Sequence, residues 1–369
     1  MNKLNLRLIF AAAMLVAIPV IANASQSRIE GLGVNGDFVK DYSSINGWPS
    51  TVNGVGSLAY VELGNGAGQM GAVLPNLWDG KFGVWSVQLN EVAPALGGYE
   101  GLGDPNFNPS QQYDITWGKK LSSMTLGINL NRSFWSIDNN TTKGSEAFRN
   151  ASGLGIGLSF NTNERTNADV ALHYSKRTFT VGNNTDNGNA SYLLQGRMMY
   201  KWQPTVTIVP VIKFYSFDNG QKNPSVNSTV AGWSAGLAGN WALGSNDLFV
   251  FGVNFDQNTV EDNSDGNYKH QSNNSPAAFM ALESQVNNWL TLRFGVNKDV
   301  FHSEKNTAGS TDRLSTGYSL STGAGVKVGA LQFDATLGDG FYNTPVANIM
   351  GNQHATDDLF SHVTATYAW

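Results

Sequence analysis

The stretch that decides the fold class is the C-terminus, Leu359-Phe360-Ser361-His362-Val363-Thr364-Ala365-Thr366-Tyr367-Ala368-Trp369. In an extended chain, every second residue from Leu359 to Trp369 lies on one face, and His362, Thr364 and Thr366 lie on the other. A period of two over ten or more residues indicates a β-strand long enough to cross a bilayer at a tilt. The alternative is the last strand of a soluble β-sandwich.

The same alternation recurs upstream. Phe249, Phe251, Val253 and Phe255, for example, alternate with small and polar residues. The connections between these runs alternate between short turns, such as Gln203-Pro204, and long segments rich in Asn, Ser, Gly and Asp. The long segments are 91–111, 137–151, 182–189, 217–228, 257–275, 298–312 and 339–357. Short turns at one end and long polar loops at the other are typical of a transmembrane, antiparallel, up-and-down β-barrel. The sequence therefore predicts an all-β fold of that type.

The number of strands follows from the alternating runs. We expect sixteen, near 56–63, 68–75, 82–90, 112–118, 121–136, 152–161, 168–181, 190–202, 205–216, 229–242, 247–257, 275–285, 288–297, 313–328, 330–338 and 358–369. The first two runs are short and flanked by glycine, and without them fourteen remain. Both numbers are even, which places both chain ends on the periplasmic side.

Composition excludes several classes of protein. Only 14% of the 369 residues are charged, against roughly 25% in ordinary soluble domains. The chain has no cysteine, so disulfides and thiolate metal sites are excluded. Without Lys3 and Arg7, 21 basic residues face 28 acidic ones, and this balance is the opposite of a nucleic-acid-binding footprint.

The first 24 residues are typical of a secretory signal peptide. Lys3 and Arg7 precede an apolar run from Leu8 to Ile21, and Ala22-Asn23-Ala24 offers the small residues needed for cleavage after Ala24. The apolar run is too short for a retained membrane anchor. Together with the C-terminal strand, which resembles the assembly signal of bacterial outer-membrane β-barrels, this predicts export to the outer membrane. The expected partners are outer-membrane lipid and, through the Trp369 strand, the barrel-assembly machinery.

Residues 25–55 form a separate segment before the barrel of 56–369. They do not alternate, and glycines and Pro49 interrupt them. Their order of Gly31-Leu32-Gly33, then Asp41, then Trp48-Pro49-Ser50-Thr51 before a strand resembles the N-terminal hatch of the long-chain fatty-acid and aromatic-hydrocarbon transporters of Gram-negative outer membranes. Gly47-Trp48 departs from that family's pattern, which has an Asn-Pro pair there. The resemblance implies a plugged fourteen-stranded barrel that passes hydrophobic molecules, with Asp41, Trp48 and Pro49 in the plug.

Ionisable side chains on the inward faces of the strands are the candidate lumen or pore-lining residues. They are His173, Arg177, Arg197, Lys201, Lys213, Glu283, Arg293, Lys327, Asp334 and His362. Basic groups dominate 168–216 and the two carboxylates come later in the chain. Opposed charges would create a field that orients solutes in the lumen. The alternative is that these groups pair with one another or with the N-terminal segment.

Motifs for catalysis, metals and cofactors lack their structural context. Gly232-Trp233-Ser234-Ala235-Gly236 matches a nucleophile elbow but lies within an alternating strand. Gly31 to Gly36 matches a dinucleotide-binding fingerprint without a following strand–helix unit. His270, His302 and His354 fall in the expected loops, at no spacing that indicates a catalytic or metal site. We therefore expect no enzyme, no cofactor and no metal ligand.

The function that these patterns favour is an outer-membrane channel or transporter for passive uptake of small molecules, hydrophobic ones included. Inward-facing apolar residues such as Val209 and Val211 favour a hydrophobic route. The alternatives are a general porin for small polar solutes and a closed structural or surface-binding barrel. The sequence does not identify the solute.

Overall fold

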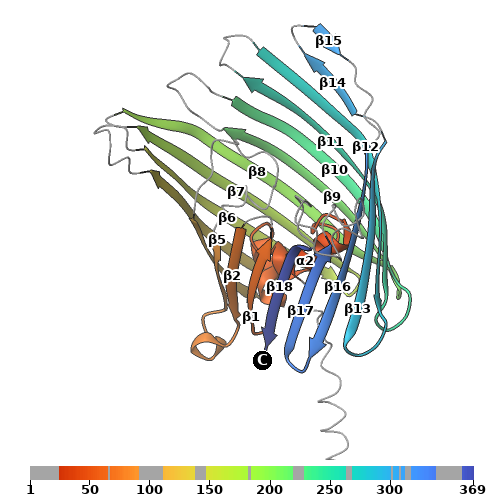
Figure 1. Ribbon diagram of the computed structural model, residues 1–369. Helices are drawn as coiled ribbons and strands as arrows, with labels where there is room; N and C mark the ends of the chain where they lie inside the picture. The colour runs from red at the N-terminus through yellow and green to blue at the C-terminus, as the bar shows by residue number, and fades with distance from the viewer. Residues whose placement is uncertain are drawn as a thin grey trace, which may run out of the picture.

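The computed structural model is a closed antiparallel β-barrel (Figure 1). The ring closes where β1, Leu58–Gly64, pairs with β18, Phe360–Ala368, in a register that places Leu58 opposite Ala368. In this way the first and last strands satisfy each other's backbone hydrogen bonds. The structure describes residues 25–64, 67–90, 111–137, 147–181, 184–218, 228–262, 268–300, 302–306, 309–311, 317–337 and 360–369.

Among the described residues the sheet contains eighteen strands, and sixteen of them form the ring. The strands are β1, β2 Ala67–Leu74, β3 Val84–Asn90, β4 Gln111–Leu121, β5 Met124–Ile137, β6 Ala147–Asn163, β7 Thr166–Val181, β8 Asn184–Gln203, β9 Val206–Asp218, β10 Ser228–Ala242, β11 Leu248–Asp262, β12 Tyr268–Gln285, β13 Leu290–Asp299, β14 His302–Asn306, β15 Gly309–Thr311, β16 Tyr318–Val328, β17 Leu331–Leu337 and β18. The β14–β15 hairpin lies outside this count, because β12 pairs with β13 near the short turns and with β14 farther along. The count of sixteen is confirmed. Fourteen, the number implied by the family resemblance, is wrong, because the short β1–β2 hairpin is the part that closes the ring.

The two faces of the wall differ as the period of two requires. In β18, Val363 and Tyr367 are exposed on the outer face, whereas Thr364 and Thr366 are buried inside. Large apolar side chains are exposed on the outer face of strands around the ring. A continuous exposed apolar band of this kind is stable only against lipid. The described residues include no helix with the length and apolar character needed to span a membrane.

Tryptophans mark the end of the barrel where the short turns lie. Trp202, Trp289 and Trp369 are 58%, 51% and 60% exposed, and each lies at or just beyond the end of a strand. Exposed indole rings at one level of a barrel are typical of the membrane–water interface. The turn end of the wall is thus the lower interface in Figure 1.

Several of the predicted long loops are partly strand: 182–189, for example, holds the start of β8 from Asn184 onward. The segment 257–275 contains the ends of β11 and β12, which pair as far as Asp262 and Tyr268, and 298–312 contains β14 and β15. Beyond the bilayer both faces of a hairpin meet water, so polar residues there carry no alternation that a sequence pattern could reveal. The predicted signal peptide, the loop 339–357 and most of the loop 91–111 lie outside the described residues.

Residues 25–57, here called the N-terminal segment, run inside the ring (Figure 1). They contain a helix, α2 Gln26–Leu32, and two short 3-10 helices, η1 Tyr42–Ser44 and η2 Pro49–Gly54. The glycine-rich sequence did not predict α2. Its start is set by the side chain of Ser25, which accepts a hydrogen bond from the Arg28 amide, and its end by Gly33 in the left-handed region at φ 60°.

Candidate functional site: the barrel interior

The N-terminal segment is joined to the wall first by an ionic network at helix α2. The guanidinium of Arg28 donates two hydrogen bonds to Glu283 on β12, each of 2.7 Å. Glu283 also accepts from Arg293 on β13 at 2.7 Å, and Arg293 donates to Asp334 on β17 at 2.7 Å. All four side chains are buried. Removing one member of such a network would leave the charge of its partner uncompensated, which is strongly destabilising.

A second anchor holds the middle of the segment. Asp37 forms an ion pair with Lys213 on β9 at 2.5 Å and accepts a hydrogen bond from the Trp48 indole at 3.0 Å. The Trp48 ring, 1% exposed, lies 4.5 Å from the guanidinium carbon of Arg197 on β8. Arg197 in turn donates to Asp169 on β7 at 2.8 Å. Arg197 therefore combines a cation–π contact with a buried ion pair.

A third anchor is made through a backbone carbonyl. The oxygen of Gly47 accepts hydrogen bonds from His173 on β7 at 2.8 Å and from Gln195 on β8 at 2.5 Å. This assignment requires the Nε2 atom of His173 to carry the proton. His173 and Gln195 are 1% and 2% exposed, so this part of the wall is covered by the segment and by its neighbours rather than by open water.

Glycines in the wall make room for the segment. A Cβ atom added to Gly295 on β13 would lie closer than 3.0 Å to the carbonyl oxygen of Leu32, and one added to Gly127 on β5 would overlap the backbone of Pro49. Gly323 on β16 likewise lies directly against the backbone of α2. Glycine weakens a strand interior, and it is used where another backbone must approach closely. The wall thus has two glycine-lined seats, one for the end of α2 and one for the start of η2.

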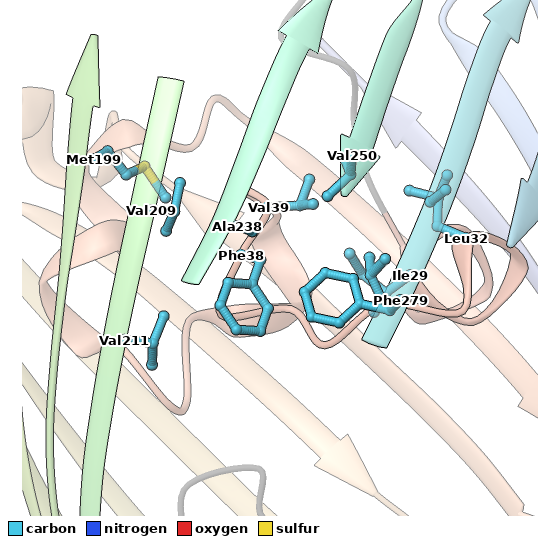
Figure 2. Packing of buried hydrophobic residues seen from close by; sticks show 12 residues of the cluster. Ile29, Leu32, Phe38, Val39, Met199, Val209, Val211, Ala238, Val250 and Phe279 are labelled. Carbon is cyan, nitrogen blue, oxygen red and sulfur yellow. The ribbon is translucent and has the colours of Figure 1, made fainter. Parts of the chain in front are cut away.

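Apolar contacts complete the docking (Figure 2). Phe38 meets Phe279 of β12 with ring centroids 4.9 Å apart. Both rings belong to one buried cluster, formed by Ile29, Leu32, Val34, Phe38, Val39, Met199, Val209, Val211, Ala238, Val250, Phe279 and Ala281. A buried Phe contributes about 3–5 kcal/mol by comparison with alanine, so the apolar and ionic anchors both hold the segment.

The inner wall is polar on one side and mixed polar and apolar on the other. Across β1 to β4 a chain of hydrogen bonds links Glu62, Gln69, Gln88, Asn90 and Asp114, with distances from 2.7 to 3.1 Å. Across β8 to β12 the inner face also carries the polar anchors Gln195, Arg197, Lys213 and Glu283, but between them lie apolar side chains, namely Leu193, Met199, Val209, Val211, Tyr215, Phe217, Ala238, Val250, Phe279 and Ala281. A lumen of this kind offers a solute two chemically different surfaces.

The structure brings seven of the ten predicted lumen residues together with the N-terminal segment or its network. These are His173, Arg197, Lys213, Glu283, Arg293, Asp334 and His362, which contacts Glu30. The other three lie elsewhere along the wall. Arg177 and Lys327 are half-buried and Lys201 is exposed. Asp41, Trp48 and Pro49, the candidates from the family resemblance, are all buried inside the ring.

Several partners were missed from the sequence. Arg28, Glu30 and Asp37 belong to a segment without a pattern, and nothing in the sequence places them opposite a given strand. Asp169 had a usable signal, because it lies on the inward face and pairs in register with Arg197. Facing residues of opposite charge on one side of a sheet attract each other.

The pKa of Asp41 gives the docking a pH dependence. Burial raises this pKa from 3.8 to about 6, against the opposing effects of Arg28 and of hydrogen bonds from Ser43. A raised pKa means that the folded state favours the protonated acid. Its contribution to stability is therefore complete below pH 3.8 and is lost as pH rises through about 6. The difference corresponds to about 3 kcal/mol.

We therefore expect the N-terminal segment of the wild-type protein to be held more tightly at pH 5 than at pH 8, and D41N to remove most of this difference. Asn keeps an oxygen for the Ser43 amide, and Arg28 keeps Glu283. The measurement is the rate at which protease cuts residues 25–57 at the two pH values. D79N, at the exposed turn before β3, is the control and should leave the pH effect unchanged. The same pH effect in D41N would contradict the assignment.

Comparison with solved structures shows that this barrel is similar in fold to barrels of other proteins. The sequence matches no protein-family model and no curated protein. A FadL homologue from Pseudomonas aeruginosa is 11% identical, with a TM-score of 0.46, and the match covers 94% of this chain and 99% of that one. CdiB from Acinetobacter baumannii is 9% identical at a TM-score of 0.45, covering 85% and 59%. The CymD monoaromatic hydrocarbon channel is 10% identical at 0.44, covering 95% and 98%. None of the three is named as an enzyme, and identities this low say nothing of a shared solute.

Proposed function

We propose that this chain is an outer-membrane channel for passive uptake of small hydrophobic molecules, with the N-terminal segment as a plug. The closed ring and its exposed apolar band support a place in a membrane. The plug is supported by the three anchors at Arg28, Asp37 and Gly47 and by the two glycine-lined seats. Passage then requires the segment to shift or to leave a route beside it.

The observation that supports a hydrophobic solute is the set of apolar side chains on the inner face of β8 to β12. Part of it packs against the N-terminal segment, but the cluster of Leu193, Tyr215 and Phe217 contains none of the segment's described residues. Packing of the plug therefore does not account for it. These three side chains are 0%, 5% and 5% exposed, so they form a closely packed apolar patch on the inner face of the wall. We infer that apolar molecules bind to this surface as they pass along β8 and β9.

Export and assembly belong to the same proposal. We infer cleavage of the signal peptide after Ala24 and recognition of the last strand by the barrel-assembly machinery. The second inference is supported by the position of β18, which completes the ring by pairing with β1. Trp369, which follows β18, stacks on Tyr367 with ring centroids 5.9 Å apart. The amide of Trp369 also donates to the carbonyl of Ser57 at 3.2 Å.

Binding of a fatty acid to the purified protein, with single-channel conductance beside it, tests this function. We expect the wild type to bind a medium-chain fatty acid and to pass little ionic current. F217A, on the inner face of β9, should weaken binding about tenfold, since one buried aromatic side chain is worth at least 1.4 kcal/mol. F214A is the matched control, because Phe214 lies on the same strand but is 48% exposed on the outer face.

The alternatives give different results in the same experiment. Large, steady, ohmic current from the wild type would support a general porin for small polar solutes, for which the hydrogen-bonded wall of β1 to β4 is the suitable surface. Neither binding nor current from a correctly folded protein would support a closed structural or surface-binding barrel. Equal weakening by F217A and F214A would place the binding outside the lumen.

A further inference from the structure

The connection between β2 and β3 is longer than its position requires. It runs from residue 75 to residue 83 and lies below β2 in Figure 1. The other described connections at this end of the barrel have two to five residues, as at 122–123 and 243–247. Because β2 and β3 pair as neighbours, a tight turn would be enough to join them. The added residues are therefore available for another role.

Four aromatic rings of this connection and the adjoining strands line an open hollow of about 450 Å³, here called the aromatic cup. They belong to Trp78, Phe82, Trp85 on β3 and Trp117 on β4. Trp78 meets Phe82 and Trp85 edge-on, with ring centroids 6.0 Å apart in both pairs. Trp78 and Phe82 are 59% and 60% exposed. The cup is as large as many small-molecule sites, and its described lining is entirely aromatic.

The backbone of the connection holds the aromatic cup in shape. The Trp117 indole donates a hydrogen bond to the carbonyl oxygen of Phe82 at 2.5 Å. Trp78 and Asp79 have φ values of 52° and 59°, in the left-handed region that residues other than glycine rarely adopt. Unfavourable backbone conformations of this kind are concentrated at binding sites. A tryptophan kept in such a conformation with its ring exposed therefore indicates a function for the ring.

The aromatic cup lies on the outer face of the wall. On β3, Ser86 is buried inside and Val87 is exposed outside, so Trp85 shares the outer face with Val87. Trp85 and Trp117 lie opposite each other in the register, at the same end of the barrel as the C-terminus (Figure 1). The cup therefore faces lipid near the lower membrane interface and does not face the lumen.

Two ammonium groups lie near the rim of the aromatic cup. Lys119 is on the outer face of β4, two residues after Trp117, and its ammonium donates to the carbonyl oxygen of Lys81 at 3.2 Å. The ammonium of Lys81 lies 3.8 Å from the carboxylate of Asp79, and both side chains are largely exposed. Two ammonium groups and one carboxylate leave one net positive charge. Cationic groups at a membrane surface attract anionic lipid headgroups.

We propose that the aromatic cup binds one anionic phospholipid of the leaflet at the turn end of the barrel. Its acyl chains lie against the four rings, and its phosphate lies at Lys81 and Lys119. A second copy of this chain or an uncharged apolar solute would cover the rings but would leave the ammonium groups without an anion. A phospholipid satisfies both parts of the site, and a cup that is already formed costs little ordering when the lipid binds.

The test counts lipids bound to the purified protein in a non-ionic detergent by native mass spectrometry. The probes are phosphatidylglycerol and phosphatidylcholine with the same acyl chains. We expect one phosphatidylglycerol to be retained, with an affinity about tenfold above that of phosphatidylcholine. W78A should weaken this binding at least about tenfold. W289A is the matched control, because Trp289 is 51% exposed at the same end of the barrel but lies outside the cup.

A second pair of variants tests the charge. K119Q should remove most of the preference for phosphatidylglycerol and leave phosphatidylcholine binding unchanged. K120Q should keep the preference, because Lys120 is exposed but its position in the strand places it on the opposite face from Lys119. All four substitutions change side chains outside the barrel interior, so we expect each variant to keep the strand content of the wild type.

The position of the lipid is checked by photo-crosslinking. A phosphatidylglycerol with a photoreactive group in its acyl chain should label the peptides 75–90 and 111–121 in the wild type and not in W78A. Unchanged binding in W78A, equal loss in W78A and W289A, labelling spread around the ring, or a dimer that excludes the lipid would overturn the inference. These measurements use no transported solute, so a failure of the proposed uptake function would leave them unchanged.

Discussion

Deletion of residues 25–55 should convert a nearly silent protein into one with large, steady, ohmic current. A ring of sixteen strands is wide enough for a water-filled channel. In this chain the interior is instead occupied by a segment with three anchors, at Arg28, Asp37 and Gly47. We expect the single-channel conductance in a planar bilayer to rise at least about tenfold, to the range of an open barrel of this size.

The control for the deletion is to add residues 25–55 back as a separate peptide. A synthetic peptide with the sequence of residues 25–55 should reduce the current of the deletion variant again, and a scrambled peptide of the same composition should not. The deletion variant must also retain the folded barrel, shown by its strand content and its resistance to unfolding in detergent. A folded deletion variant without current would mean that something other than this segment blocks the lumen.

The sequence predicted the wall because a membrane barrel constrains it strictly. Each strand must present apolar residues to lipid at every second position, and the ring must close. Val363 and Tyr367 outside, with Thr364 and Thr366 inside, illustrate how directly this rule can be read. The inward position of Arg197 and Asp334 follows from the same parity.

The interior could not be predicted in the same way. The contact between Arg28 and Glu283 joins residues 255 positions apart, and no periodicity relates them. Helix α2 has seven residues, too few for a recognisable amphipathic pattern, and its ends depend on Ser25 and Gly33. Nothing in the sequence identifies the backbone that lies against Gly127 and Gly295, because that backbone comes from a distant part of the chain.

Substitution of one glycine should release the plug without removing any of its contacts directly. In G295A the new Cβ would lie closer than 3.0 Å to the carbonyl oxygen of Leu32, which is backbone and has little freedom to move away. Overpacking of this kind costs about 1–3 kcal/mol. We expect the docked population to fall by about tenfold to a hundredfold relative to the undocked one, with current steps like those of the deletion variant.

The matched control separates this effect from a change in the wall itself. Gly196 on β8 is also within a strand, but a Cβ atom there would be 3.8 Å from its nearest neighbours, an ordinary contact. Alanine is at least as favourable as glycine in a strand, so neither substitution should weaken the barrel. G196A should therefore remain silent while G295A conducts, and protease should cut the N-terminal segment faster only in G295A. If G295A were as silent and as protected as the wild type, α2 would not sit against β13 in the membrane, and the ionic network of Arg28 could not be the anchor that holds it there.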